Sequence, residues 1–336
     1  MNRNATTRRL GIAAGAAAAL ALGGLGAAAP AGATPRTSAS VSGDTLTVSG
    51  SSASESLALR LAAGDPNTLQ VDFGDDGSAE HSFDRSTFSS IEVSLRSGTD
   101  RFRVDQVNGA FADESLTVDG GSGNDTLDGG DGVEVFHGGS GNDAVDGNRG
   151  NDTGILGSGQ DSFRWDPGDG SDVVEGESGT DTLDFNGAAA NETMSLSPNG
   201  DRAVFLRDVA NIRMDTDGVE RLDLTALGGT DTVTVDDMTG TDFRQANVDL
   251  SGPAGGGDGQ ADTVTVNGTD RRDAIDVRAD GGVVDVAGLR TTVDLAGSEP
   301  TDLLQIKALG GDDDVDVDPA AQALVNVIVD LGTGQR

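Results

Sequence analysis

Acidic residues and glycines recur every nine positions between Gly120 and Asp184, and these are the side chains of the sequence best suited to chemistry. In register, the segments are GGSGNDTLD, GGDGVEVFH, GGSGNDAVD, GNRGNDTGI and LGSGQDSFR, then, after two further residues, PGDGSDVVE and GESGTDTLD. The sixth place is always acidic: Asp125, Glu134, Asp143, Asp152, Asp161, Asp172 and Asp181. Glycine turns carry inward-facing carbonyls, and carbonyls with one carboxylate form the hard oxygen shell that Ca²⁺ prefers. The pattern predicts a row of calcium-binding turns.

Each of these turns must be followed by a short strand that holds it in place. The eighth place is apolar in six segments (Leu127, Phe136, Val145, Phe163, Val174 and Leu183), and only Gly154 departs from this rule. One apolar side chain that points inward from three residues is a minimal strand. A flexible acidic linker has no reason to keep an apolar residue at every ninth position. We therefore expect turns and strands to alternate.

The segments resemble the RTX, or haemolysin-type, calcium-binding nonapeptide GGxGxDxUx. The resemblance covers residues 120–184, about a fifth of the chain. It implies a parallel β-roll in which each nonapeptide is half a coil and several Ca²⁺ ions are bound by the seven acids. The turn glycines expected to share in the metal sites are Gly121, Gly123, Gly139, Gly141, Gly157 and Gly159.

In such a roll, acids two repeats apart would stack across an ion. The expected pairs are Asp125 with Asp143, Glu134 with Asp152, Asp143 with Asp161, Asp152 with Asp172, and Asp161 with Asp181. Coils ~4.8 Å apart would make each pair repel by roughly 3 kcal/mol at an effective dielectric constant of about 20. Five pairs together rival the net stability of a typical domain, ~5–15 kcal/mol. We therefore expect the roll to depend on its metal.

The flanks, residues 34–119 and 185–336, read as short alternating strands broken by glycine-rich turns. One phrase occurs three times: IEVSLRSGTDRFRV from Ile91, LDLTALGGTDTVTV from Leu222 and LQIKALGGDDDVDV from Leu304. We interpret these flanks as three divergent copies of one larger unit, with the nonapeptides (120–184) inserted after the first. The expected fold is all-β, a parallel β-roll or β-solenoid with irregular solenoid coils on both sides. Two β-sandwich domains around a roll are the alternative.

Composition argues against most other functions. The chain has 22 basic and 57 acidic residues, a net charge of −35, and this sign repels the phosphates of nucleic acids. There is no Cys, only two His, and neither an HExxH nor a GxSxG motif. Lys307 is the only lysine, so a basic cleft for acidic polysaccharide is poorly supported. We expect no catalytic site and no cofactor other than Ca²⁺.

The first residues read as an export signal. Arg3, Arg8 and Arg9 precede an apolar run from Leu10, and a small-x-small cleavage site ends at Ala33. We expect residues 1–33 to be a cleavable signal peptide of a bacterial extracellular protein whose mature chain has no membrane span. Both the general secretory and the twin-arginine route stay open.

These features predict an extracellular calcium-binding protein that folds on Ca²⁺ and has a structural or interaction role. A calcium-dependent adhesin or cell-surface matrix protein is the second hypothesis, and a solenoid enzyme acting on acidic polysaccharide is the third. The sequence stops where another turn would begin, and an open solenoid edge favours self-association. Dense acidic turns at 229–231 and 311–314 could hold further ions.

Overall fold

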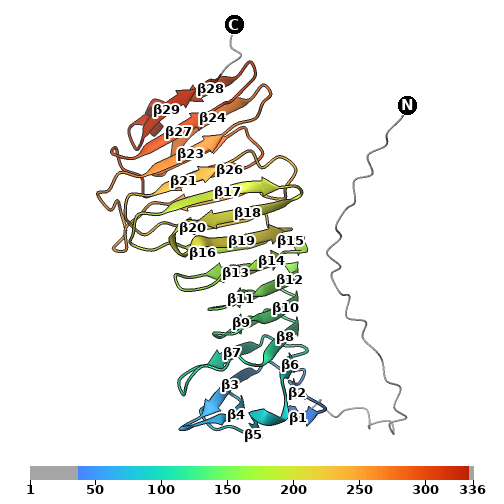
Figure 1. Ribbon diagram of the computed structural model, residues 1–336. Helices are drawn as coiled ribbons and strands as arrows, with labels where there is room; N and C mark the ends of the chain where they lie inside the picture. Colours follow the sequence, from blue (N-terminus) through green and yellow to red (C-terminus); the bar gives the residue numbers. More distant parts are fainter. Residues whose placement is uncertain (1–36, 333–336) are drawn as a thin grey trace, which may run out of the picture. The chain divides into compact units, whose positions relative to one another are not determined.

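The computed structural model describes residues 37–332, which lie in the compact unit Pro35–Arg336. This unit is nearly all-β and consists of two long sheets of mainly parallel strands, stacked from β1 and β5 at one end to β28 and β29 at the other (Figure 1). The predicted all-β solenoid is therefore confirmed. The predicted signal peptide lies outside the described residues, and within those residues no helix is long and apolar enough to cross a membrane.

The first sheet has 15 strands. In spatial order these are β1 (Ser38–Ser42), β2 (Thr45–Ser49), β6 (Ser90–Ser94), β8 (Ser115–Ser122), β10 (Glu134–Ser140), β12 (Thr153–Gly159), β14 (Val173–Glu175), β19 (Ile212–Asp217), β18 (Arg202–Arg207), β17 (Thr193–Asn199), β21 (Thr232–Val235), β23 (Thr263–Asn267), β27 (Leu303–Lys307) and β29 (Asn326–Asp330). The short strand β15 (Ser178–Gly179) also pairs with β12.

The second sheet has 14 strands. In spatial order these are β28 (Asp314–Val317), β24 (Ala274–Asp280), β25 (Val283–Ala287), β26 (Thr292–Ala296), β22 (Gln245–Asp249), β20 (Arg221–Thr225), β16 (Thr182–Asn186), β13 (Ser162–Trp165), β11 (Ala144–Asp146), β9 (Thr126–Asp128), β7 (Arg101–Asp105), β3 (Ser56–Ala62), β4 (Asp65–Phe73) and β5 (His81–Asp84). Three short helical turns complete the unit: η1 (Arg85–Thr87), η2 (Val209–Asn211) and α1 (Pro319–Gln322).

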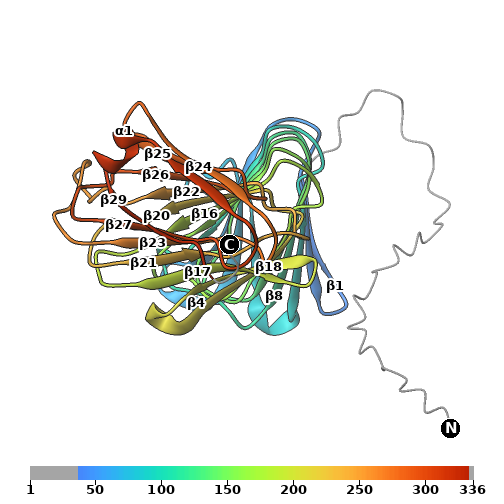
Figure 2. The same cartoon turned by 90° about the horizontal axis from the view of Figure 1, so that it is seen from above.

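Within the nonapeptides the chain crosses from one sheet to the other after every repeat. Strands β8, β10 and β12 therefore pair in parallel in the first sheet, and β9, β11 and β13 do so in the second. Val145 lies in register with Leu127 on one side and Phe163 on the other. Two repeats make one coil, as the resemblance implied, and in the view along the stack successive turns lie over one another (Figure 2).

The apolar residues of the eighth places fill the space between the two sheets. All six are buried, and Phe163 also covers Gly154, the exception in the pattern. A Cβ on Gly154 would come within 2.8 Å of the Phe163 ring. At the end of the row, the buried Trp165 stacks on Phe185 with ring centroids 4.1 Å apart. The absence of a side chain at Gly154 thus leaves room for the large ring of Phe163.

The flanks continue the same two sheets, so the alternative of two separate β-sandwiches is wrong. Strand β8 runs through the predicted segment boundary at residues 119 and 120. The division of the chain into an N-terminal segment, a nonapeptide block and a C-terminal segment stays a prediction. Each larger unit inserts antiparallel strands that the nonapeptides lack: β3–β4–β5, β17–β18–β19 and β24–β25–β26. These insertions explain why the flanks have no fixed repeat length.

We expect Gly154→Ala to destabilise the calcium-loaded protein by about 1–3 kcal/mol, because the added methyl group overpacks a full interior against Phe163. Adding Phe163→Leu should recover part of this loss, because the smaller side chain makes room. Urea denaturation of the two single variants and the double variant measures the coupling. Additive effects would show that the two residues do not meet across the core.

Candidate metal centre

The nonapeptide turns lie along two edges of the stack. At the edge that we call the first edge, the chain passes from the first sheet to the second. Its turns are residues 120–125, 138–143, 156–161 and 176–181. The second edge carries the return turns, residues 129–134, 147–152 and 165–172. Every turn ends in its acidic residue, so the seven acids predicted as ligands form two separate rows.

On the first edge, each acid is tied to the acid of the next coil. The Asp125 N–H donates to Asp143 Oδ1 at 2.8 Å, and the Asp143 N–H donates to Asp161 Oδ1 at 2.7 Å. The Asp161 N–H donates to Asp181 Oδ1 at 2.9 Å. All four side chains are buried. One oxygen of each carboxylate is therefore used to stack the coils.

The second edge repeats this arrangement. The Glu134 N–H donates to Asp152 Oδ1 and the Asp152 N–H donates to Asp172 Oδ1, both at 2.8 Å. All three side chains are buried. The five acid pairs expected from the repeat spacing are thus all neighbours, joined through an amide and a carboxylate.

In five of the seven acids the second carboxylate oxygen has no such partner. The Oδ2 atoms of Asp125, Asp143, Asp161 and Asp181 on the first edge, and of Asp152 on the second, are buried without a hydrogen bond. A buried polar atom without a partner costs about 1–3 kcal/mol, and more if it carries charge. Five such atoms in a repeated position suit a bound cation.

The turn glycines place backbone carbonyls close to these oxygens. The six glycines predicted for the metal sites all have positive φ, between 93° and 154°, at the second and fourth places of the first-edge turns. A side chain at Gly141 would overlap the carbonyl oxygen of Gly123, one coil away, and Gly159 stands in the same relation to Gly141. Only glycine allows both this backbone conformation and such close stacking.

The first glycine of a turn lies against the second oxygen of the turn's own carboxylate and against a carbonyl of the next coil. A Cβ on Gly120 would lie 2.7 Å from Asp125 Oδ2 and 2.7 Å from the carbonyl oxygen of Gly138 in the next coil. Gly138 makes the same kind of cradle with Asp143 Oδ2 and the Leu156 carbonyl. A carboxylate of one coil and a carbonyl of the next thus face a common point.

Burial raises the pKa of the carboxyl groups in both rows. Loss of solvent raises the pKa of Asp125 and Asp143 to about 6 and that of Asp172 and Asp181 to about 7. Desolvation also raises the pKa of Asp161, Glu134 and Asp152, and the charges of Glu134 and Asp172 add to the effect at Asp152. Without a cation, these carboxylates hold protons between about pH 4 and 6 that exposed carboxylates would have lost.

This oxygen set suits calcium. Ca²⁺ takes six to eight hard oxygen ligands in a flexible shell, including backbone carbonyls, whereas Mg²⁺ demands a tight octahedron. Among residues 37–332, no three His, Asp or Glu side chains converge on one point. That agrees with turns that offer one carboxylate per coil and take their other oxygens from the backbone.

Comparison with known families agrees with this geometry. A family model described as "RTX calcium-binding nonapeptide repeat (4 copies)" matches residues 117–144, 128–163 and 168–188. The chain carries RTX calcium-binding repeats. They support calcium binding by this chain, in agreement with the sequence-based prediction, and the repeat family is generally structural rather than catalytic. No curated protein matches the chain.

The sequence did not predict how far the RTX rows extend. The Asp100 N–H donates to Asp125 Oδ1 at 2.8 Å, and the Asp181 N–H donates to Glu220 Oε2 at 2.9 Å. Asp100 belongs to the recurring phrase that starts at Ile91, and its GTD sequence was the available signal. Glu220 carries no such signal, because it follows the insertion β17–β19.

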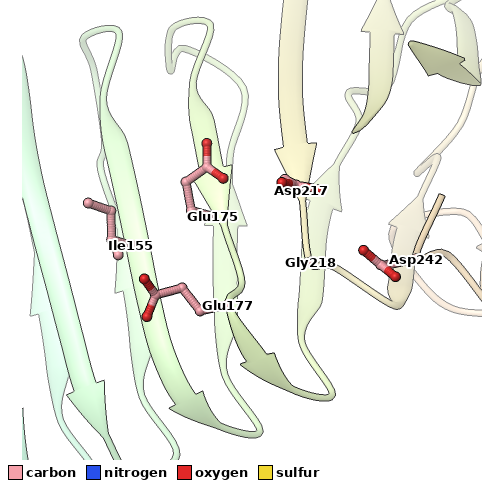
Figure 3. Close-up of a pocket in the computed structure, with 6 residues that line it drawn as sticks. All are labelled: Ile155, Glu175, Glu177, Asp217, Gly218 and Asp242. Atoms are coloured by element: carbon pink, nitrogen blue, oxygen red, sulfur yellow. The ribbon is translucent and has the colours of Figure 1, made fainter. Parts of the chain in front are cut away.

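An acidic pocket of about 320 Å³ opens where the repeats meet the C-terminal flank (Figure 3). It is lined by Ile155, Glu175, Glu177, Asp217, Gly218 and Asp242. Arg202 pairs with Glu175 at 2.9 Å and approaches Asp217 at 3.6 Å. The lining has four carboxylates and no serine, cysteine or histidine, and Arg202 already pairs with two of those carboxylates.

We expect metal-free protein to be more stable at about pH 5 than at about pH 8. The folded carboxylates have pKa values above the unfolded value of ~3.9, so the folded state binds more protons between about pH 4 and 7. Stability from this source is lost as the pH rises through about 6 to 7. Thermal unfolding in EGTA at both pH values tests it, and higher stability at the alkaline value would contradict it.

Proposed function

We propose that the protein is an extracellular calcium-binding protein whose RTX block folds on binding Ca²⁺ and so orders a structural or interaction module. The ligands would be the second carboxylate oxygens of Asp125, Glu134, Asp143, Asp152, Asp161, Asp172 and Asp181, together with turn carbonyls, including those of the six positive-φ glycines. The observation that carries the proposal is the repeated buried Oδ2 atom without a partner. When bound, calcium would supply positive charge next to these oxygens.

The extracellular location is supported by the predicted signal peptide and by the usual setting of RTX proteins. Folding on calcium is supported by the same buried carboxylates. Pairing with a cation lowers the cost of burying them. Extracellular Ca²⁺, in the millimolar range, would supply that cation after export. Calcium would then provide the cross-linking that disulfide bonds provide in other exported proteins, since this chain has no cysteine.

We expect a calcium titration of residues 34–336 to raise the far-UV circular dichroism signal of β-structure, with a midpoint of about 10⁻⁴–10⁻³ M. Magnesium should fail, because it requires a smaller and more regular site. The variant Asp143→Asn/Asp161→Asn should lose most of the gain, because Asn keeps the Oδ1 hydrogen bonds but removes the anionic charge.

The matched control is Asp128→Asn/Asp146→Asn, which removes the same charge from the ninth places of two nonapeptides, at acids outside the two rows. It should respond to calcium as the wild type does. A wild-type spectrum that is fully β in EGTA and does not change with calcium would rule out calcium-dependent folding. Equal loss in both double variants would show that only net charge matters.

A calcium-dependent adhesin or matrix protein is the second candidate, favoured by the exposed interior at β29. Val327 and Val329 face the core yet are half-buried, whereas Leu304 and Ile306 in the neighbouring strand β27 are fully buried. Ile328 on the other face is 46% exposed. Within the described residues β29 pairs with β27 alone. A second copy of the chain that pairs with this edge would cover these residues.

We expect sedimentation velocity to show larger species in calcium than in EGTA if this candidate is correct. Ile328→Lys should then restore the monomer, because a charged side chain on an edge strand opposes pairing. Val107→Lys, at an exposed apolar residue far along the chain, is the control and should still associate. A wild-type chain that stays monomeric in calcium would exclude self-association.

A further inference from the structure

Three turns outside the nonapeptides have the backbone of the first-edge RTX turns. They are residues 95–100, 226–231 and 308–313, one in each copy of the recurring phrase. Arg96, Leu227 and Leu309 take the place of the second glycine, and each has positive φ, at 77°, 71° and 62°. Non-glycine residues rarely adopt this conformation, so the turn shape is held by its surroundings.

The turn at 226–231 also reproduces the hydrogen bonds of the RTX rows. The Glu192 N–H donates to Asp231 Oδ1 at 2.8 Å, and the Asp231 N–H donates to Asp262 Oδ1 at 2.8 Å. The Asp262 N–H continues to Asp302 Oδ1 at 3.1 Å. This third row of acids is formed by turns that precede β17, β21, β23 and β27, outside the residues that the RTX family model matches.

Asp231 has the same unpartnered carboxylate oxygen as the RTX acids. It is 1% exposed, and its Oδ2 atom is buried without a hydrogen bond. Among residues 37–332, no arginine or lysine forms an ion pair with it. Asp258, from the glycine-rich loop after β22, lies against the same turn, and its Oδ2 accepts a hydrogen bond from Gly229 N–H at 3.0 Å. Two carboxylates thus meet at one turn without a countercharge.

The preceding acid of this row shows how the chain neutralises such a position by itself. A Cβ on Gly187 would lie 2.6 Å from Glu192 Oε2 and 2.9 Å from the Ala226 carbonyl, the same cradle as at Gly120. Here, however, the buried Arg207 donates through Nε to Glu192 Oε1 at 2.5 Å, and its guanidinium lies 5.2 Å from the Trp165 ring. Asp231, one coil further, has no such arginine.

We propose that the turn at residues 226–231 binds a calcium ion of its own, with Asp231 Oδ2 as the anionic ligand and Asp258 as the second carboxylate at the site. The inference rests on the proposed function, since it extends the same chemistry to a turn without the RTX sequence. Asp100 has an equally buried and unpartnered Oδ2, but it adjoins Asp125 and cannot be tested apart from the RTX row.

The test is the calcium stoichiometry of residues 34–336, measured by isothermal titration calorimetry. Asp231→Asn should lower the bound calcium by about one ion per chain while the far-UV response of the RTX block is kept. Asn retains the Oδ1 acceptor for Glu192 N–H, so the stack is preserved. The matched control Asp280→Asn, at an exposed acid in the β24–β25 turn, should bind as much calcium as the wild type.

Unchanged stoichiometry in Asp231→Asn would overturn this inference alone, whereas a wild type that binds no calcium would overturn the proposed function as well. If Asp231→Asn does not fold, crystals of the wild type grown in calcium decide the question. An anomalous-scattering peak beside Asp231 Oδ2 supports the site. Peaks beside Asp143 and Asp161 without one at Asp231 reject it and leave the RTX sites intact.

Discussion

The structure depends on a buried carboxylate whose two oxygens lie in different surroundings. Oδ1 accepts a hydrogen bond from an amide N–H of the neighbouring coil and so sets the spacing of the stack, as between Asp125 and Asp143. Oδ2 faces backbone carbonyls and has no hydrogen bond. The first interaction favours the fold and the second opposes it, because burial of an unpaired charge is costly. A cation at Oδ2 would remove the conflict, and the proposed dependence of stability on metal rests on this.

The other features of the repeats follow from this constraint. The coils approach closely enough for the hydrogen bond because a glycine occupies the fourth place of every nonapeptide turn. Close coils in turn bring the eighth-place residues of both sheets together in one buried layer between the sheets. Two acids of the flanks solve the same problem differently, since Arg207 pairs with Glu192 and Arg85 holds Glu114 through two hydrogen bonds of 2.7 Å. There the cation is part of the chain, and those coils need no metal at these acids.

Much of the central block could be predicted from the sequence, because its contacts follow a fixed spacing. The acid pairs, the buried eighth places and the parallel coils all depend on a period of nine residues. The flanks could not be predicted in this detail. The pairing of Arg207 with Glu192 depends on the antiparallel insertion β17–β19, and no local pattern gives its length or register. Likewise Leu227 has positive φ because the stack imposes it, against the preference of the residue.

The most direct test of this account is amide hydrogen exchange of residues 34–336, followed by mass spectrometry in calcium and in EGTA. Opening of a structural unit is reported by exchange of its own amides, so each region is read separately. We predict that peptides within 120–184 are protected in calcium and exchange rapidly in EGTA, whereas peptides that contain the Arg207–Glu192 pair change less. Equal protection of residues 120–184 in both conditions would contradict the central claim that the buried Oδ2 atoms require a cation.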